Sequence, residues 1–271
     1  MLMADDALAA DDILKRGQML AQQGDLDGAA ASYRRADQLG HPGAAWRLGV
    51  LEAKRGDVAA AYRWLTLADE RSDAEGSYNL GVLLEESLHE EDSAMAAYGR
   101  ADDAGHAGGA TNLGVILARR GDRESAIDAL HRGQARGDVQ ATFCLGVLRD
   151  KDGDLAGAAA LYRVAAEGGH ANAAFNLGQL LRDGGDIAGA REAFARGDEL
   201  GQADCAFNLA VFCLESNDTL GAEAAFARAD ERGSGGAAHF LGMLLADRGD
   251  LAGAQAAQRR ASERGYVAAA G

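Results

Sequence analysis

One two-helix unit recurs eight times along the chain and sets the limits on its fold. The copy at residues 173–202, AAFNLGQLLRDGGDIAGAREAFARGDELGQ, reads as a helix, a tight turn and a second helix. We number positions in each repeat from a glycine of the first helix, the anchor glycine: Gly17, Gly49, Gly81, Gly114, Gly146, Gly178, Ala210 in its place, and Gly242. The anchors are 32 residues apart, with one extra residue between Gly81 and Gly114. A fixed period of this length predicts a solenoid, because a single two-helix unit cannot bury its apolar face alone.

The turn and the second helix repeat as regularly as the anchor. Seven residues after the anchor most repeats carry Gly-Asp, as at Gly185-Asp186. Glycine adopts the left-handed conformation that ends a helix, and aspartate caps the helix that follows. A small residue at +12, a large one at +16 and a small one at +19 then keep one face of the second helix apolar. Repeat seven has Asn217 instead of the glycine, and repeat three has LEESLHEEDSA, which predicts a longer and more mobile turn.

Composition excludes several classes of protein. Hydrophobic residues make up 48% of the chain, which is ample for a folded core. The chain has 27 basic and 42 acidic side chains, a formal charge of −15. A surface of that sign repels phosphate backbones and anionic lipid, so neither nucleic acid nor a membrane is an expected partner.

The cysteines and the N-terminal sequence predict a reduced compartment. Three cysteines, Cys144, Cys205 and Cys213, are an odd number without the spacing of a disulfide framework. The opening MLMADDALAADD lacks the basic and apolar regions of a signal peptide, and no apolar stretch is long enough to cross a bilayer. The sequence therefore predicts a cytoplasmic protein.

The repeats divide the chain into three expected segments. Residues 1–12 are expected to be an acidic N-terminal lead-in, and residues 13–265 a single solenoid of eight repeats. Residues 266–271 are expected to be either the start of a truncated ninth unit or a C-terminal tail. Repeat eight has Gln258 where most other repeats have a large apolar residue, so its second helix is expected to form a more polar end.

These residues resemble two related families. Leu and Gly in FNLG, Gly-Asp seven residues later, Ala at +12, an aromatic residue at +16 and Ala at +19 resemble the tetratricopeptide repeat. The usual proline after the second helix is missing and the link is shorter, so that end of the unit resembles the Sel-one-like repeats, although their longer turn is absent. The resemblance covers residues 13–265. It implies an all-α, right-handed superhelical solenoid whose concave groove is lined by the first helices, and it implies an interaction scaffold.

A helical wheel of the first helix separates a core half from a half expected to face the groove. The groove half is largely apolar in two rows. At −3 stand Trp46, Tyr78, Thr111, Phe143, Phe175, Phe207 and His239, and at +1 stand Val50, Val82, Val115, Val147, Gln179, Val211 and Met243. We therefore predict that aromatic side chains and valines contact a bound segment.

Asparagine recurs at −2, beside the aromatic row, as Asn79, Asn112, Asn176 and Asn208. An amide can donate to and accept from a peptide backbone. Tetratricopeptide proteins that hold extended peptides use asparagine at the matching position, so the resemblance implies a row of peptide-holding amides here. At +5 the charge changes along the chain from Lys54, Arg119 and Lys151 to Asp183, Glu215 and Asp247, with Glu86 as an exception. Such a gradient would orient a peptide, although a chance drift explains it as well.

Two structural alternatives stay open at this point. The −3 aromatic residues are as well explained as core between repeats, and the asparagines as bonded to neighbouring loops. If the aromatic row faces the groove, Phe175→Ala should leave the melting temperature unchanged, whereas Leu177→Ala should cost ~2–5 kcal/mol.

None of the candidate metal-binding or catalytic motifs in the sequence is complete. Asp150, Asp152 and Asp154 resemble a calcium loop, but Leu155 and Leu161 stand where that loop needs glycine and glutamate. His41, His106 and His170 share one loop position in alternate repeats, too far apart for one metal ion, and read as surface histidines. Neither Cys144 nor any pair of carboxylates forms a catalytic set.

The sequence therefore predicts a non-enzymatic scaffold, without cofactor or metal, that binds a peptide or protein segment in its concave groove. The alternative is a structural or oligomerising module that assembles through the C-terminal end of its solenoid. A catalytic or nucleic-acid-binding array is the third and weakest hypothesis.

Overall fold

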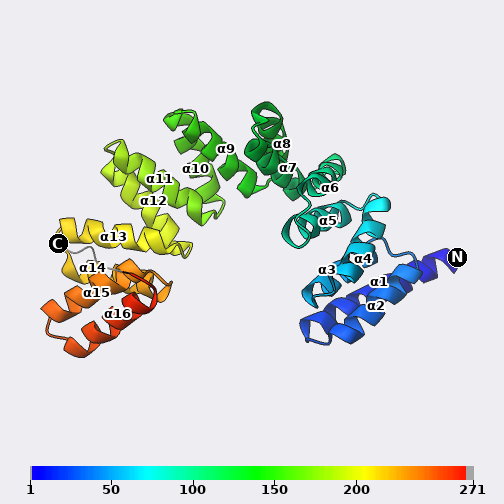
Figure 1. Ribbon diagram of the computed structural model, residues 1–271, viewed down its shortest axis with the longest axis horizontal. Coiled ribbons are helices and arrows are strands. Elements are labelled where there is room, and N and C mark those ends of the chain that lie inside the picture. The colour runs from blue at the N-terminus through cyan, green and yellow to red at the C-terminus, as the bar shows by residue number, and fades with distance from the viewer. Residues whose placement is uncertain (1, 267–271) are drawn as a thin grey trace. The chain divides into compact units, whose positions relative to one another are not determined.

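The computed structural model describes residues 2–266, and every regular element in that range is an α-helix (Figure 1). The first helices of the eight repeats are α1 (Leu2–Gln22), α3 (Ala44–Lys54), α5 (Ala74–Glu86), α7 (Ala107–Arg120), α9 (Val139–Lys151), α11 (Ala171–Asp183), α13 (Ala203–Glu215) and α15 (Gly235–Asp247). The second helices are α2 (Leu26–Gln38), α4 (Val58–Glu70), α6 (Glu91–Asp103), α8 (Arg123–Ala135), α10 (Leu155–Glu167), α12 (Ile187–Glu199), α14 (Thr219–Glu231) and α16 (Leu251–Glu263). The predicted eight helical hairpins are confirmed.

The Gly-Asp turn works as its chemistry predicts. In repeat six Gly185 has φ +85°, and the Asp186 carboxylate accepts a hydrogen bond of 2.9 Å from the Gly189 amide. The same cap is made in six further repeats by Asp25, Asp57, Asp122, Asp154, Asp218 and Asp250. Each second helix that follows such a turn therefore begins with one of its free amides satisfied.

The two irregular turns follow from their residues. Asn217 takes φ +57°, as predicted for the residue that replaces glycine. Residues 87–90 link α5 to α6, one residue more than the three-residue link of a regular repeat such as 184–186. There His89 takes the left-handed conformation, and the Glu90 side chain makes no capping hydrogen bond. The predicted lengthening of this turn is confirmed.

The anchor glycine makes room for the large residue at +16. A Cβ atom built on Gly178 would lie 2.6 Å from Phe194, and one on Gly81 would lie 2.6 Å from Tyr98. Both rings are almost completely buried. The first and second helix of a repeat thus approach closely because the residue between them has no side chain.

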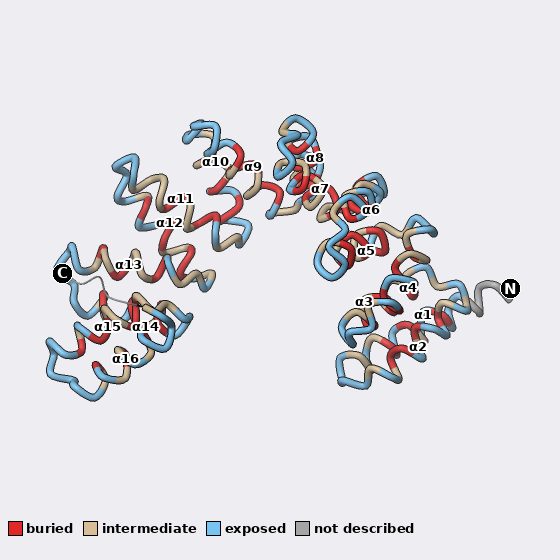
Figure 2. The backbone as a smooth tube through the Cα atoms, viewed as in Figure 1, coloured by how far each residue is buried: buried red, intermediate tan, exposed pale blue. Residues whose placement is uncertain are grey.

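The chain divides into two compact units, residues 1–141 and residues 142–271. In the first unit, one core lies around Tyr33 and Leu48 and another around Leu65 and Tyr98. In the second unit, the largest core surrounds Phe226. Figure 2 shows buried residues along the first and the second helices of each unit. The boundary lies inside α9, and the continuity of residues 13–265 as one solenoid stays a prediction.

The structure describes the expected N-terminal segment but only the first residue of the expected C-terminal one. The lead-in is not a separate segment, because α1 begins at Leu2 and runs without a break into repeat one. Its sequence is rich in alanine and leucine, which favour helix. At the other end, Tyr266 is the last described residue, so the expectation for a ninth unit or tail falls on residues 267–271, outside the described range.

Buried aspartates join successive second helices, a feature absent from the sequence predictions. Asp198 of α12 is 8% exposed and accepts hydrogen bonds from Arg228 of α14 and from Arg232, the residue that follows α14. Equivalent clamps join Asp102 to Arg132 and Arg136, and Asp230 to Arg260 and Arg264. Burial alone would raise the pKa of these aspartates, but the arginine hydrogen bonds outweigh it and hold each pKa below its usual value.

Candidate peptide-binding faces of the first helices

The aromatic side chains at −3 lie half-buried, between the two alternatives that the sequence left open. In four repeats the ring at −3 contacts the ring at +16 of the second helix. The ring centroids lie 6.0 Å apart in Tyr78–Tyr98, 5.9 Å in Phe143–Tyr162, 6.1 Å in Phe175–Phe194 and 5.3 Å in Phe207–Phe226. Trp46 likewise packs against the core cluster that includes Leu65, and Arg47 lies over its indole ring. One side of the row therefore supports the core, and the other side is accessible.

Two of the three recurring histidines, His106 and His170, are helix N-caps, whereas His41 accepts a hydrogen bond from the amide of Gly43, the residue before α3. His106 begins α7, where its Nδ1 accepts a 3.0 Å hydrogen bond from the Gly109 amide, and its ring stacks on Tyr78 at 4.3 Å. His170 begins α11, bonds to the Ala173 amide and stacks on a −3 ring at 4.2 Å. The −3 residue of one repeat therefore meets the first residue of the next, which the shared loop position of the histidines could have indicated.

In repeats four and eight the −3 residue is a threonine and a histidine, and each forms a side-chain hydrogen bond. In repeat four Thr111 is 1% exposed, and its hydroxyl bonds to Asp138, which stands just before α9. In repeat eight His239 and Gln258 bond to each other, with Nδ1 and Oε1 3.0 Å apart. Gln258 thus fills the place of the aromatic residue at +16 with a polar partner for −3.

The asparagines at −2 divide into two pairs. Asn79 and Asn208 each donate to the carbonyl oxygen four residues earlier in their own helix at 2.7 Å, and Asn208 also accepts from Arg182. Asn112 lies beside Tyr98 and Asn176 beside Tyr162. Burial raises the pKa of both tyrosines, that of Tyr162 to about 12, and outweighs the lowering of each pKa by the neighbouring amide. The fold thus uses part of the hydrogen-bonding capacity of Asn79 and Asn208.

The two basic residues of the predicted site, Arg119 and Lys151, differ in their surroundings. Arg119 forms ion pairs with Glu85 at 3.2 Å and Glu91 at 2.6 Å, so it joins repeats three and four of the first unit. Lys151 is exposed at the end of α9. Of these two, Lys151 offers the freer charge.

Two hollows are lined by the predicted groove positions. In the first unit a hollow of about 370 Å³ lies between α1 and α3, lined by −3, −2, +1 and +5 residues of repeat two: Trp46, Arg47, Val50 and Lys54. In the second unit a hollow of about 590 Å³ lies between α10 and α11, lined by −2, +1 and +5 residues of repeat six: Asn176, Gln179 and Asp183. The same positions are therefore accessible in both units.

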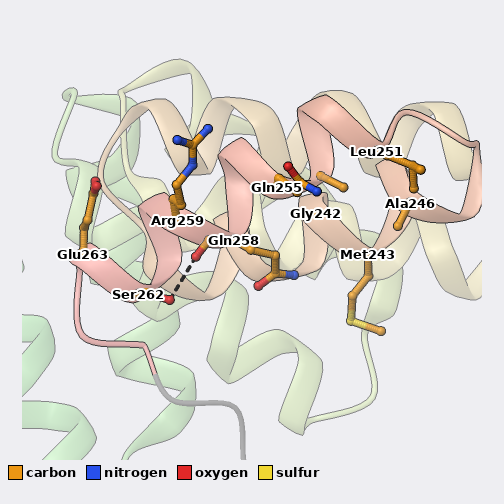
Figure 3. A pocket seen from close by; sticks show the side chains of 10 residues that line it. Gly242, Met243, Ala246, Leu251, Gln255, Gln258, Arg259, Ser262 and Glu263 are labelled. Carbon is orange, nitrogen blue, oxygen red and sulfur yellow. Dashed lines mark hydrogen bonds between the residues drawn. The ribbon is translucent and has the colours of Figure 1, made fainter.

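A third hollow, of about 890 Å³, lies on α15 and α16 (Figure 3). Its apolar lining includes Met243, 48% exposed, and Leu251, 66% exposed. Gln255, Gln258, Arg259 and Glu263 add polar groups along α16. This surface combines exposed apolar groups with a polar border, as interaction surfaces do.

Among residues 2–266, no group of three or more His, Cys, Asp or Glu side chains is placed to hold a metal ion. Burial raises the pKa of the Cys205 thiol to about 12, which disfavours the nucleophilic thiolate. None of the helices in this range has the length and hydrophobicity that a bilayer crossing requires.

Comparisons with known proteins agree with this architecture. Residues 111–174 and 175–237 each match the family model described as Tetratricopeptide repeat. No curated protein sequence matches the chain. A Sel1 repeat protein from Oxalobacter formigenes superposes with a TM-score of 0.74 and 20% identity, over 97% of this chain and 87% of the other.

Two further solved structures are similar. A protective antigen of uropathogenic Escherichia coli strains, which displays an SLR fold, gives a TM-score of 0.71 at 21% identity over 97% of this chain. The chain spans 64% of the length of that antigen. A tetratricopeptide repeat protein from Parabacteroides merdae gives a TM-score of 0.53 at 14% identity, over 88% of this chain and 99% of the other.

Fold and matches together define the protein as an all-α helical-repeat protein. Residues 111–237 match the tetratricopeptide repeat, and the fold of the chain is similar to that of Sel1 repeat proteins, the two families that the sequence resembles. Proteins of this kind are generally protein-interaction scaffolds.

Proposed function

We propose that the protein is a non-enzymatic scaffold that binds a peptide or protein segment along the inner faces of its first helices. The proposal concerns the −3, −2, +1 and +5 positions within each unit. It includes the residues that the sequence selected: Trp46, Tyr78, Asn79, Asn112, Arg119, Phe143, Lys151, Phe175, Asn176, Phe207 and Asn208.

One observation carries the proposal: the predicted groove positions line a hollow in each unit. A solenoid whose first helices were fully occupied with internal packing would leave these positions buried. Here Val115 is 38% exposed and Met243 48% exposed at +1, and the −3 rings keep one accessible side. Apolar surface beside amides fits a segment that buries side chains and bonds through its backbone.

The half-buried rings make a good floor for such a segment. Each ring is fixed by its +16 partner and, in two repeats, by a stacked histidine. A bound segment would therefore not have to order these side chains, which lowers the entropic cost of association.

The test is selection of binders from a random linear peptide library displayed on phage. The groove variant replaces Asn79, Asn112, Asn176 and Asn208 by alanine. The control variant replaces the exposed second-helix residues Arg63, Asp128 and Glu192 by alanine. We expect the wild-type protein and the control to bind the selected peptides, and the groove variant to lose most of the affinity while it stays folded. Equal binding by the two variants would contradict the proposal.

The hollow on α15 and α16 favours a second candidate function, assembly of copies through the C-terminal face. Met243 and Leu251 would be buried by a partner molecule there. Light scattering at increasing concentration tests it. A mass that rises toward the dimer and returns to the monomer with Leu251→Glu supports assembly, and Leu220→Glu, at an exposed leucine of α14, is the control. A constant monomer mass removes this candidate.

A further inference from the structure

The hollow between α10 and α11 is lined by carboxylates without any basic residue, unlike the hollow on α15 and α16, which includes Arg259. It combines an apolar wall, amide groups and a carboxylate rim, and it holds about 590 Å³, within the range of small-ligand sites. The apolar wall consists of Leu155, Ala156, Ala159, Leu180 and Leu181. The inference about what this hollow binds rests on the proposed function.

Gln179 is the unusual residue of this hollow. Its position, +1, is occupied by Val50, Val82, Val115, Val147, Val211 and Met243 in the other repeats from two to eight. The Oε1 atom of Gln179 is shielded from solvent and accepts no hydrogen bond from the described residues. A buried acceptor without a donor is unfavourable, so packing alone does not explain a glutamine where valine fits. The terminal torsion of glutamine is broad, and its rotation can turn this oxygen toward a donor in the hollow.

Three carboxylates surround the hollow, and none of the residues that line it is basic. Asp183 pairs with the neighbouring Arg182 at 3.5 Å, and its side chain is 73% exposed. Asp150 accepts one long hydrogen bond, 3.3 Å, from the Tyr162 hydroxyl. Asp186 caps α12 with one carboxylate oxygen. The rim is therefore negative and keeps spare acceptor capacity.

We infer that this hollow receives the side chain of an arginine or lysine from the bound segment. The methylene stem would lie on the leucine and alanine wall. The cationic head would donate to the Gln179 carbonyl oxygen and to the carboxylate rim, both of which only accept hydrogen bonds. An anionic or purely apolar side chain would leave these acceptors without donors.

The hollow between α1 and α3 provides an internal control. It also contains −2, +1 and +5 residues, but these are Arg47, Val50 and Lys54. Its charge is opposite, so a cationic side chain should not bind there. The two hollows thus predict different occupants from the same positions of two repeats.

The experiment is an NMR titration of the full chain with N-acetyl-arginine amide, and with N-acetyl-citrulline amide as an uncharged control of similar shape. We expect the arginine compound to give saturable shifts at the amides of Asn176, Gln179 and Leu180. No such shifts are expected at Trp46 or Lys54, or with the citrulline compound. Gln179→Val, which copies the neighbouring repeats, should keep the fold and lower the affinity about tenfold or more.

Three results would overturn the inference. They are equal shifts with the two compounds, unchanged affinity in Gln179→Val, or no shift at Asn176 and Gln179 up to the solubility limit of the arginine compound. The peptide selection is a separate readout. Groove-binding peptides without arginine or lysine would contradict this inference and leave the proposed function standing. Arginine binding in the hollow without any selected peptide would support the hollow and contradict the proposed function.

Discussion

At the scale of single residues, the anchor glycine and the residue at +16 determine how closely the two helices of a repeat approach. Gly81 of α5 faces Tyr98 of α6, whose ring is 1% exposed. We predict that Gly81→Ala lowers the free energy of unfolding by about 1–3 kcal/mol, because the new methyl group would displace a buried ring. Urea denaturation followed by circular dichroism measures the change.

The control lies in the same hairpin. Gly99 of α6 is helical, and a Cβ atom there meets nothing within 4 Å. Gly99→Ala should therefore stabilise the protein by about 0.5–1 kcal/mol, since alanine has the higher helix propensity. The same sign for the two substitutions would contradict the packing role of the anchor glycine.

The −3 row gives a second residue-scale prediction, which corrects the expectation from the sequence. Phe175 is half-buried against Phe194, so Phe175→Ala should not leave stability unchanged. We expect a loss of about 1–2 kcal/mol, against about 2–5 kcal/mol for Leu177→Ala at a 4% exposed position. Thermal unfolding of both variants provides the measurement. Equal losses would mean that the row belongs to the core and has no binding face.

Residue chemistry explains which site features the sequence could predict. The repeat period and the apolar pattern of the sequence predicted which first-helix positions line the candidate site, because both follow from helix geometry alone. The partners of these positions could not be predicted in the same way. Tyr78 meets His106, and Thr111 meets Asp138, 28 and 27 residues along the chain. Such contacts depend on how one repeat lies against the next, which no local pattern encodes.

At the scale of elements, the arginine clamps tie successive second helices together and make stability depend on pH. The pKa of Asp198 in the folded protein lies below its ordinary value of 3.8. The clamp therefore stabilises the fold fully above the unfolded pKa and loses this contribution as the pH falls through the folded pKa. The clamp of Asp230 follows the same rule.

We predict that Asp198→Asn together with Asp230→Asn lowers stability at neutral pH by about 1–3 kcal/mol for each clamp, since asparagine keeps the shape but not the charge. The loss of stability on acidification below pH 3.8 should become smaller in the double variant. Denaturation midpoints from neutral to acidic pH check this. Parallel pH curves for the variant and the wild type would show that the clamps do not contribute.

Turn chemistry made the hairpins predictable at this scale. In most repeats Gly-Asp predicted where the first helix ends and the second begins. Asn217 takes the left-handed conformation predicted for the residue that replaces glycine. The sequence predictions assigned no helix to the acidic lead-in, where alanine and leucine between the acidic residues continue α1 to Leu2. The clamps were missed because each joins residues about one repeat apart, such as Asp198 and Arg228.

At the scale of the whole molecule, the repeats separate two tasks by helix. The second helices carry the +16 residues and the clamps, which hold each unit together. The first helices carry rings, amides and charges that line hollows in both units. We therefore expect a partner segment to bind to the first helices and to leave the second helices unchanged.

Amide hydrogen exchange with and without a library-selected peptide tests this claim most directly. We expect slower exchange in the first helices, most strongly in α3 beside Arg47 and in α11 beside Gln179. Exchange in the second helices should stay unchanged, except at the start of α10, which borders the hollow between α10 and α11. Slower exchange confined to second helices such as α4, α12 and α14 would contradict this expectation.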